Sequence, residues 1–436
     1  MILYYTGTGN SRYAAKLLGH RLNDTVRDCT PFMQGGTTPR FHSVTPWVFV
    51  CPTYAWQIPH IFADFLTRCH FSGSRQAYFV MTCGGEIHNA PETNRKLCTL
   101  WGCLEILSNV APEAFSPLFH EPKIKNIAEY ICNVHVEGPY YLNFGDCSPL
   151  AGRCGAREYR FGQAVGSDAL QALAAADFRA DADPDHLQNP DGSTHINLWY
   201  RLTTAFAEQE LMECAAIPQH LPTVWYPSVG VYAARQGSWV LGAKFGSNGD
   251  SHNHNDTGSI TVYKDGRPFL IDIGVESYTQ KTFSPQRYEI WTMQSAWHNL
   301  PTFDGVQQLP GAEYTAREVC TDKNSITGEL AGAYPPIPGL TTYHRSVSVS
   351  EQGVTLRDET DYPGTVELTL LTEQQPVPTA DGFAVGILGG IRFDPGAVTA
   401  AVTAVPITDP RLRTAWPETL YKITLHFQKM LNLELY

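Results

Sequence analysis

Hydrophobic positions follow three successive patterns along the chain. Up to about residue 102, short apolar runs alternate with stretches of helical spacing, which predicts an α/β region. From 103 to about 220, apolar residues recur every three or four positions and predict helices. From 221 to 436, apolar and polar residues alternate, as in the strands of an antiparallel β-sandwich. The sequence therefore predicts a multidomain chain with regions 1–102, 103–220 and 221–436.

Each region can be divided into elements. In the first, we expect the strands of a parallel sheet at 2–5, 47–51 and 76–82, and helices at 12–22 and through Phe62 and Leu66. In the second, we expect no strands and helices at 125–132, 156–165, 167–175 and 197–212. In the third, the expected strands include 223–226, 229–233, 239–245, 346–350 and 366–371, and a hairpin over 258–274 that turns at Asp265-Gly266.

The stretch 249–256 holds the densest group of chemically active residues. His252 and His254 are two positions apart, so on an extended strand both side chains point to one face. The hairpin that follows should bring Asp272 back beside them, and His298 supplies a third imidazole. Two neutral imidazoles and a carboxylate form an ordinary zinc site. The alternative is a polar strand end whose histidines bind only backbone groups.

Four ordered motifs extend this group. They are His252-Asn-His254-Asn-Asp256, Asp272-Ile-Gly274, Ser295-Ala-Trp-His298-Asn299 and Asp304-Gly-Val-Gln-Gln308. Together they resemble the C-terminal half of heparinase II/III-type polysaccharide lyases, from about residue 126 to 308. The resemblance implies that His252 is catalytic and that His254, Asp272 and His298 hold a structural zinc ion. The expected helices of 103–220 are similar to the closing helices of the family's α/α toroid.

The stretch 133–146 resembles the family segment that carries a catalytic tyrosine, which makes Tyr141, or else Tyr140, the candidate. The resemblance implies β-elimination on a uronic-acid-containing polysaccharide, so the expected partner is an acidic polysaccharide or oligosaccharide. The family's residue that neutralises the uronate carboxylate lies on earlier toroid helices, where this chain has its α/β region. We therefore expect turnover to be impaired. A glycan-binding remnant without catalysis is an alternative.

The α/β region resembles a truncated flavodoxin. In flavodoxins, a Thr-rich loop after the first strand holds the FMN phosphate, and two later loops border the flavin. By position, the FMN-binding residues would be Thr6, Thr8, Gly9, Asn10, Ser11, Tyr54, Trp56, Gly84 and Gly85. An FMN-dependent electron carrier is therefore a further alternative function. The similarity fades near residue 102, before the fifth strand of a flavodoxin. The fusion is either a genuine two-domain protein or a misjoined reading frame. The second is favoured, because the flavodoxin-like part and the lyase-like part would each be interrupted within its own hydrophobic core.

Net charge and cysteine content bear on the expected partners and the expected cellular location. The 436 residues carry a net charge of −12, so the composition does not favour binding to nucleic acid or anionic lipid. An acidic glycan would need a local basic cleft on this acidic protein. We expect no membrane segment, because the N-terminus resembles no export signal and no apolar run approaches about 18 residues. Eleven cysteines without CxxC spacing favour reduced thiols, so we expect a cytoplasmic protein.

Overall fold

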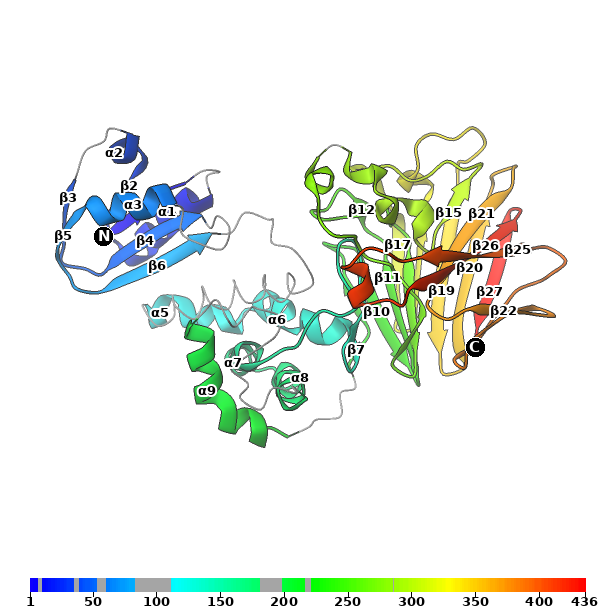
Figure 1. The fold of residues 1–436 in the computed structure, drawn as a ribbon, viewed down its shortest axis with the longest axis horizontal. Coiled ribbons are helices and arrows are strands. Elements are labelled where there is room, and N and C mark those ends of the chain that lie inside the picture. Colours follow the sequence, from blue (N-terminus) through cyan, green and yellow to red (C-terminus); the bar gives the residue numbers. More distant parts are fainter. Residues whose placement is uncertain are drawn as a thin grey trace. The chain divides into compact units, whose positions relative to one another are not determined.

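A computed structural model describes residues 1–6, 10–34, 39–52, 60–82, 111–180, 198–215, 221–284 and 286–436 (Figure 1). The chain divides into two compact units. The first comprises Met1–His88 and Lys96–Ile124, and the second comprises Asn89–Arg95 and Lys125–Tyr436. The region boundaries that we expected near residues 102 and 220 lie outside the described residues.

The first unit is built on a parallel sheet, as predicted. Its strands are β1 (Ile2–Tyr4), β2 (Val26–Asp28), β4 (Trp47–Pro52) and β6 (Ala77–Thr82), in the order β2-β1-β4-β6. A second parallel pair joins β3 (Arg40–Ser43) to β5 (His70–Gly73). The helices of the unit are α1 (Asn10–Leu22), α2 (Thr30–Gln34), α3 (His60–Arg68), α5 (Pro112–Phe115) and the 3-10 turn η1 (Ser116–His120).

Alternation along β1 gives this sheet two covered faces. Ile2 and Tyr4 are buried in one cluster with Leu18 of α1, whereas Leu3 is buried in another with Phe62 and Phe65 of α3. Successive strand residues point to opposite faces, so one short apolar strand contributes to both cores. The expected strands and helices of this unit are therefore confirmed to within a few residues.

Helices precede the sandwich of the second unit, and the first of them begins three residues before Lys125. They are α6 (Pro122–Val134), α7 (Ala156–Val165), α8 (Asp168–Arg179) and α9 (Leu198–Glu213), in the expected places. The Ser167 hydroxyl accepts a hydrogen bond from the backbone N–H of Leu170 at 3.3 Å and caps α8. None of the described helices is long and apolar enough to span a membrane.

Our expectation that this region contains no strands was wrong. A short hairpin follows α6 and consists of β7 (His135–Glu137) and β8 (Tyr140–Tyr141). Gly138 lies between the two strands with φ +55°, a backbone conformation that glycine adopts without strain. The hairpin is too short to produce a recognisable alternation in the sequence.

The rest of the second unit is an antiparallel β-sandwich (Figure 1). One layer is an eight-stranded sheet of β17 (Arg317–Thr321), β18 (Ser325–Glu329), β19 (Tyr343–Ser350), β20 (Gly353–Thr360), β27 (Met430–Leu435), β24 (Gly389–Arg392), β23 (Gly382–Val385) and β22 (Pro376–Thr379). The other contains a five-stranded sheet of β14 (Arg267–Leu270), β13 (Ile260–Lys264), β11 (Trp239–Lys244), β10 (Val231–Gln236) and β9 (Val224–Tyr226). It also contains a four-stranded sheet of β15 (Pro301–Phe303), β21 (Val366–Thr372), β26 (Thr419–Phe427) and β25 (Thr399–Pro406). One large apolar core draws side chains from all three sheets.

The remaining elements of the unit are short. A two-stranded sheet joins β12 (Ser247–Asn248) to β16 (Gly311–Thr315). The 3-10 turns are η2 (Gln280–Phe283), η3 (Arg287–Glu289), η4 (Trp291–Met293), η5 (Ser295–Trp297), η6 (Ala331–Ala333) and η7 (Leu412–Thr414). The predicted hairpin is confirmed as β13 and β14, and its turn residues Asp265 and Gly266 have φ values of +51° and +70°. Two residues with positive φ are what the favoured Asp-Gly hairpin turn requires.

Candidate functional site

The loop that carries His252 and His254 is not the extended strand that we expected. It lies between β12 and β13, and His252 has a φ of +59°. The amide of Asn253 donates to the backbone carbonyls of Asn248 at 2.5 Å and of His254 at 3.0 Å. These bonds hold the chain in a compact loop, so the alternation rule for strands does not apply to it.

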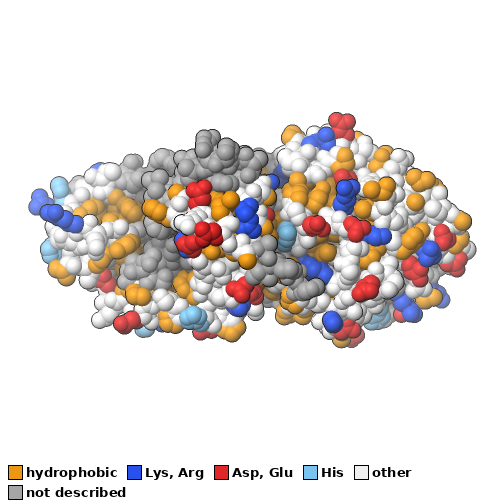
Figure 2. All heavy atoms as spheres, turned by 90° about the horizontal axis from the view of Figure 1, so that it is seen from below, with side chains coloured by type: hydrophobic (Ala, Val, Ile, Leu, Met, Phe, Trp, Pro, Cys, Tyr) orange, Lys and Arg blue, Asp and Glu red, His pale blue; other side chains and the backbone are white. Residues whose placement is uncertain are grey.

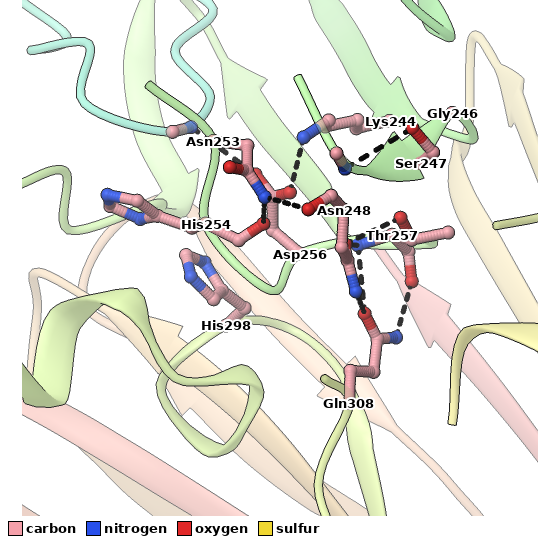
Figure 3. Close-up of polar contacts among 12 residues, drawn as sticks. Lys244, Gly246, Ser247, Asn248, Asn253, His254, Asp256, Thr257, His298 and Gln308 are labelled. Atoms are coloured by element: carbon pink, nitrogen blue, oxygen red, sulfur yellow. Dashed lines mark hydrogen bonds and ion pairs between the residues drawn. The ribbon is translucent and has the colours of Figure 1, made fainter. Parts of the chain in front are cut away.

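The three expected metal ligands do lie together. The ligand atoms of His254, Asp272 and His298 are within 4.8 Å of one another, and all three residues are buried. Figure 3 shows the imidazoles of His254 and His298 as neighbours, with ring centroids 5.3 Å apart. Within the described part of the chain, Nδ1 of His254 and Nε2 of His298 are buried without a hydrogen-bond partner. Two buried nitrogens with unused lone pairs beside a carboxylate are a donor set that suits zinc.

Asp272 is held in place by its own turn. Oδ1 accepts a hydrogen bond from the backbone N–H of Gly274 at 2.9 Å, and Oδ2 lies 2.8 Å from Nδ1 of His298. Gly274 has a φ of +77°, and a Cβ on it would lie 2.8 Å from the carbonyl oxygen of Cys147. Both the backbone conformation and the close approach require glycine here.

Asn299 fixes the position of His298. Its side-chain amide donates to the carbonyls of Ile260 at 2.7 Å and Ile271 at 3.0 Å, and its Oδ1 accepts from the backbone N–H of Leu371 at 2.8 Å. Asn299 thereby joins the five-stranded and four-stranded sheets. His298 directly precedes it and follows the 3-10 turn η5. Both N–H groups and the oxygen of the Asn299 amide have hydrogen-bond partners. The neighbouring residue His298 therefore has little freedom to move.

The last residue of the His-x-His-x-Asp motif has a different partner. Oδ1 of Asp256 lies 2.6 Å from Nζ of Lys244, and both side chains are buried (Figure 3). Burial alone would raise the pKa of Asp256, but the Lys244 charge and the neighbouring imidazoles lower it below its ordinary value. Asp256 is thus ionised, and its ion pair with Lys244 holds the loop against β11. Gln308, from the Asp304-Gly-Val-Gln-Gln308 motif, holds the same loop by donating to the carbonyl of Thr257 at 2.7 Å.

His252 lies beside this cluster and is paired with Asp146. Its Nδ1 is 2.8 Å from Oδ2 of Asp146, and 12% of its side chain is exposed. Oδ1 of the same carboxylate lies 3.0 Å from Nε2 of His254 and 2.5 Å from Nη2 of Arg287. Burial alone would raise the pKa of Asp146, but the hydrogen bonds with both histidines and the Arg287 charge lower it far below its usual range. Our sequence reasoning missed Asp146 and Arg287.

A second arginine borders the same place. Nη2 of Arg411 donates to the backbone carbonyl of Asp146 at 3.1 Å, and its guanidinium lies 4.3 Å from the ring centroid of Tyr278. With Arg287, it places two positive charges near His252, although acidic and basic side chains are interspersed over the sandwich on the face shown in Figure 2.

The two candidate tyrosines have other partners. The ring of Tyr141 packs on His135 with centroids 4.9 Å apart, and burial, together with Cys154 and Asp177, raises its pKa far above the usual range. Tyr140 packs against Tyr263, with ring centroids 6.0 Å apart. By contrast, Tyr278 donates to Oδ2 of Asp146 at 2.9 Å. Nothing in its sequence spacing singles out Tyr278.

Most of the expected FMN site lies outside the described residues. This applies to Thr8, Gly9, Tyr54, Trp56, Gly84 and Gly85, and to the side chain of Asn10. Thr6 follows β1, and Ser11 is buried in the first turn of α1. The structure therefore describes only the strand-to-helix framework of that site.

One family model matches part of the second unit. The family model described as heparinase II/III-like, C-terminal, matches residues 218–384, a range that includes His252 and the three expected metal ligands. None of the curated proteins matches the chain.

Several solved structures of polysaccharide lyases are similar to this chain. One heparinase III structure is 14% identical with a TM-score of 0.52, covering 79% of this chain and 50% of that one. A second heparinase III structure is 14% identical with a TM-score of 0.50, covering 80% and 53%. Heparan sulfate lyase HepC from Pedobacter heparinus is 14% identical with a TM-score of 0.48, covering 80% and 50%. The chain therefore spans about half the length of the two heparinase III structures, and the likeness to them concerns the fold.

Proposed function

We propose that this chain is a heparinase II/III-like lyase that cleaves a uronic-acid-containing polysaccharide by β-elimination, with impaired turnover. One observation carries the proposal. Within the residues that match the family model, a buried cluster of His254, Asp272 and His298 lies beside the partly exposed His252, which shares a carboxylate with His254. Beside the ion pair of Arg287 with Asp146, Arg411 adds a positive charge near this histidine, which suits an acidic sugar.

We propose zinc as the ion for the buried cluster. His254, Asp272 and His298 would hold it, because two imidazoles and a carboxylate are ligands that zinc prefers. The unused nitrogens of the two histidines support this assignment. The ion would fix the loop that bears His252, a positioning role.

The reaction needs two proton transfers. A base removes the proton at C5 of the uronate, the electron pair forms the C4–C5 double bond, the C4–O bond breaks, and an acid protonates the departing oxygen. His252 would act as one of these two groups. Tyr140 and Tyr141 are the candidates that the family resemblance implies for the other. Tyr278, whose hydroxyl shares Asp146 with His252, is the candidate that the geometry adds.

We expect turnover to be weak. In the family, the side chain that neutralises the uronate carboxylate lies on toroid helices that precede the segment matched here. In this chain, the described residues before α6 are built on a parallel sheet. We infer that these described residues supply no such side chain, so the C5 proton is less acidic and its removal is slow.

The test is an elimination assay on the purified, zinc-supplemented chain with heparan sulfate, chondroitin sulfate, hyaluronan and alginate. The absorbance of the unsaturated uronate reports the reaction. We expect slow product formation on one of these glycans, abolished by His252→Ala and unchanged by His344→Ala, which alters an exposed histidine on β19. Rapid elimination would contradict the expected impairment. Saturable glycan binding without product would overturn the lyase proposal and favour a glycan-binding remnant.

A second candidate function, FMN binding, is favoured by one observation on the first unit. The order β2-β1-β4-β6 corresponds to the first four strands of the 2-1-3-4-5 order of flavodoxin-like sheets, in which FMN binds where the order reverses. Thr6 and Ser11 lie at the end of β1 and the start of α1, next to that point. Flavin absorbance in the purified chain, or quenching of FMN fluorescence on titration, would support this function. Absence of both signals would rule it out.

A further inference from the structure

We propose that Asp146 is a positioning residue that fixes the tautomers of His252 and His254 and thereby couples the proton-transfer histidine to the metal cluster. The inference rests on the proposed function for the roles of these two histidines, but its geometry is independent of any activity. One carboxylate contacts both rings, Oδ2 at Nδ1 of His252 (2.8 Å) and Oδ1 at Nε2 of His254 (3.0 Å).

The carboxylate of Asp146 receives two donors on each oxygen. Arg287 Nη2 and His254 Nε2 contact Oδ1, while the Tyr278 hydroxyl and His252 Nδ1 contact Oδ2. A carboxylate that is bound this closely by a guanidinium is ionised and can only accept hydrogen bonds. Both ring nitrogens that face it must therefore carry hydrogen.

This requirement determines where the lone pairs of the neutral rings lie. In His254 the lone pair is on Nδ1, the buried nitrogen without a hydrogen-bond partner among the described residues. That atom faces the cluster with Asp272 and His298 and is the one that can bind a metal ion. In a neutral His252 ring, the same requirement puts the hydrogen on Nδ1 and the lone pair on Nε2. One side chain thus prepares both rings for their roles.

The backbone holds Asp146 firmly enough for this task. Its N–H donates to the carbonyl of His252 at 3.2 Å, and its own carbonyl accepts from Arg411 at 3.1 Å. The preceding residue, Gly145, has a φ of +58°, and a Cβ on it would lie 2.6 Å from the carbonyl oxygen of His252. The segment that carries Asp146 is therefore packed directly on the histidine loop, as positioning at hydrogen-bond precision requires.

The first experiment needs no mutation. In the full chain labelled with ¹⁵N-histidine, long-range ¹H–¹⁵N spectra distinguish protonated from unprotonated ring nitrogens. Spectra of His252→Gln and His254→Gln assign the signals. We expect hydrogen on Nδ1 of His252 and on Nε2 of His254 in the neutral rings. Hydrogen on Nε2 of His252, or on Nδ1 of His254, would overturn the proposal whether or not the chain is a lyase.

The second experiment measures zinc affinity by competition with a chromophoric chelator. Asp146→Asn places an amide donor against one of the rings, so we expect zinc affinity to fall about 10- to 100-fold. Asp250→Asn removes the same charge from an exposed position in the same loop and is the matched control, for which we expect no change. Equal affinities for wild type and Asp146→Asn would overturn the coupling. Circular dichroism checks that each variant is folded, and a failed elimination assay would leave both results interpretable.

Discussion

Arg345 and Asp358 form a bidentate ion pair that is completely buried inside the sandwich. Nε and Nη2 of Arg345 lie 2.8 and 2.7 Å from the two carboxylate oxygens. The remaining nitrogen, Nη1, donates to the backbone carbonyls of Gly258 at 2.9 Å and Asn299 at 2.6 Å. Arg345 lies on β19 of the eight-stranded sheet, so this one side chain joins that sheet to the two segments that flank the metal cluster.

Removing one charge of this pair should destabilise the second unit strongly. We expect Asp358→Asn to lower the free energy of unfolding by about 3 to 5 kcal/mol, because it leaves a buried guanidinium without its counter-charge. Urea denaturation, followed by near-ultraviolet circular dichroism, measures the change. The matched control is Asp381→Asn, which breaks an exposed pair with Arg392 and should change stability far less, because water screens the charges of this pair. Equal losses of stability in the two variants would contradict the prediction that burial makes the Arg345–Asp358 pair costly to break.

Gly274 should be sensitive to substitution for two separate reasons. Alanine there would have a positive φ and a Cβ 2.8 Å from the carbonyl oxygen of Cys147, and the turn that holds Asp272 would have to move. We expect Gly274→Ala to lower stability by about 2 kcal/mol or more and to weaken zinc binding. Zinc titration and urea denaturation of the purified variant measure the two effects.

Gly138→Ala is the matched control for this substitution. Gly138 also has a positive φ, but a Cβ on it would meet no atom within 4 Å. We expect the change to cost only about 1 kcal/mol and to leave zinc affinity unchanged. A similar loss of zinc affinity in both variants would contradict this reasoning.

Local patterns account for what the sequence predicted correctly. The Asp265-Gly266 turn favours one hairpin, and that hairpin returns the chain so that Asp272 approaches His254 and His298. The parallel sheet of the first unit followed from short, fully apolar strands that alternate with helical spacing. In these cases, residues close in sequence decide the structure.

The parts that could not be predicted depend on contacts between distant residues. Asp146 lies 106 positions before His252, and no spacing rule connects them. The left-handed backbone of His252 arises in a loop that the Asn253 side chain stabilises, so the alternation of His252 and His254 was misleading. For Tyr141, the family resemblance named the residue, whereas its burial against His135 could be known only from the structure.

Zinc should stabilise the sandwich if the buried cluster binds it. A ligand that binds only the folded state at 100 times its Kd adds about 2.7 kcal/mol to the free energy of unfolding. We therefore expect a higher melting temperature with zinc and a reversal by a chelator. His298→Ala should abolish the shift, because it removes one of the two unused buried nitrogens. His344→Ala, on the exposed side of β19, should retain it, and a zinc-induced shift that survives in His298→Ala would exclude this site.

Asp177 should make the stability of the helical region depend on pH. Burial raises its pKa to about 6, outweighing the hydrogen bond that it accepts from the backbone N–H of Cys154. In the unfolded chain its pKa is about 4, so between these values the folded state binds more protons than the unfolded state. The stabilising contribution of the protonated form is complete below about pH 4 and is lost as pH rises through about 6, a change on the order of 3 kcal/mol. Asp177→Asn stays neutral and can still accept from Cys154. We therefore expect the variant to gain stability over wild type as pH rises from 4 to 7 in thermal melts, and a difference that stays constant over this range would refute the assignment.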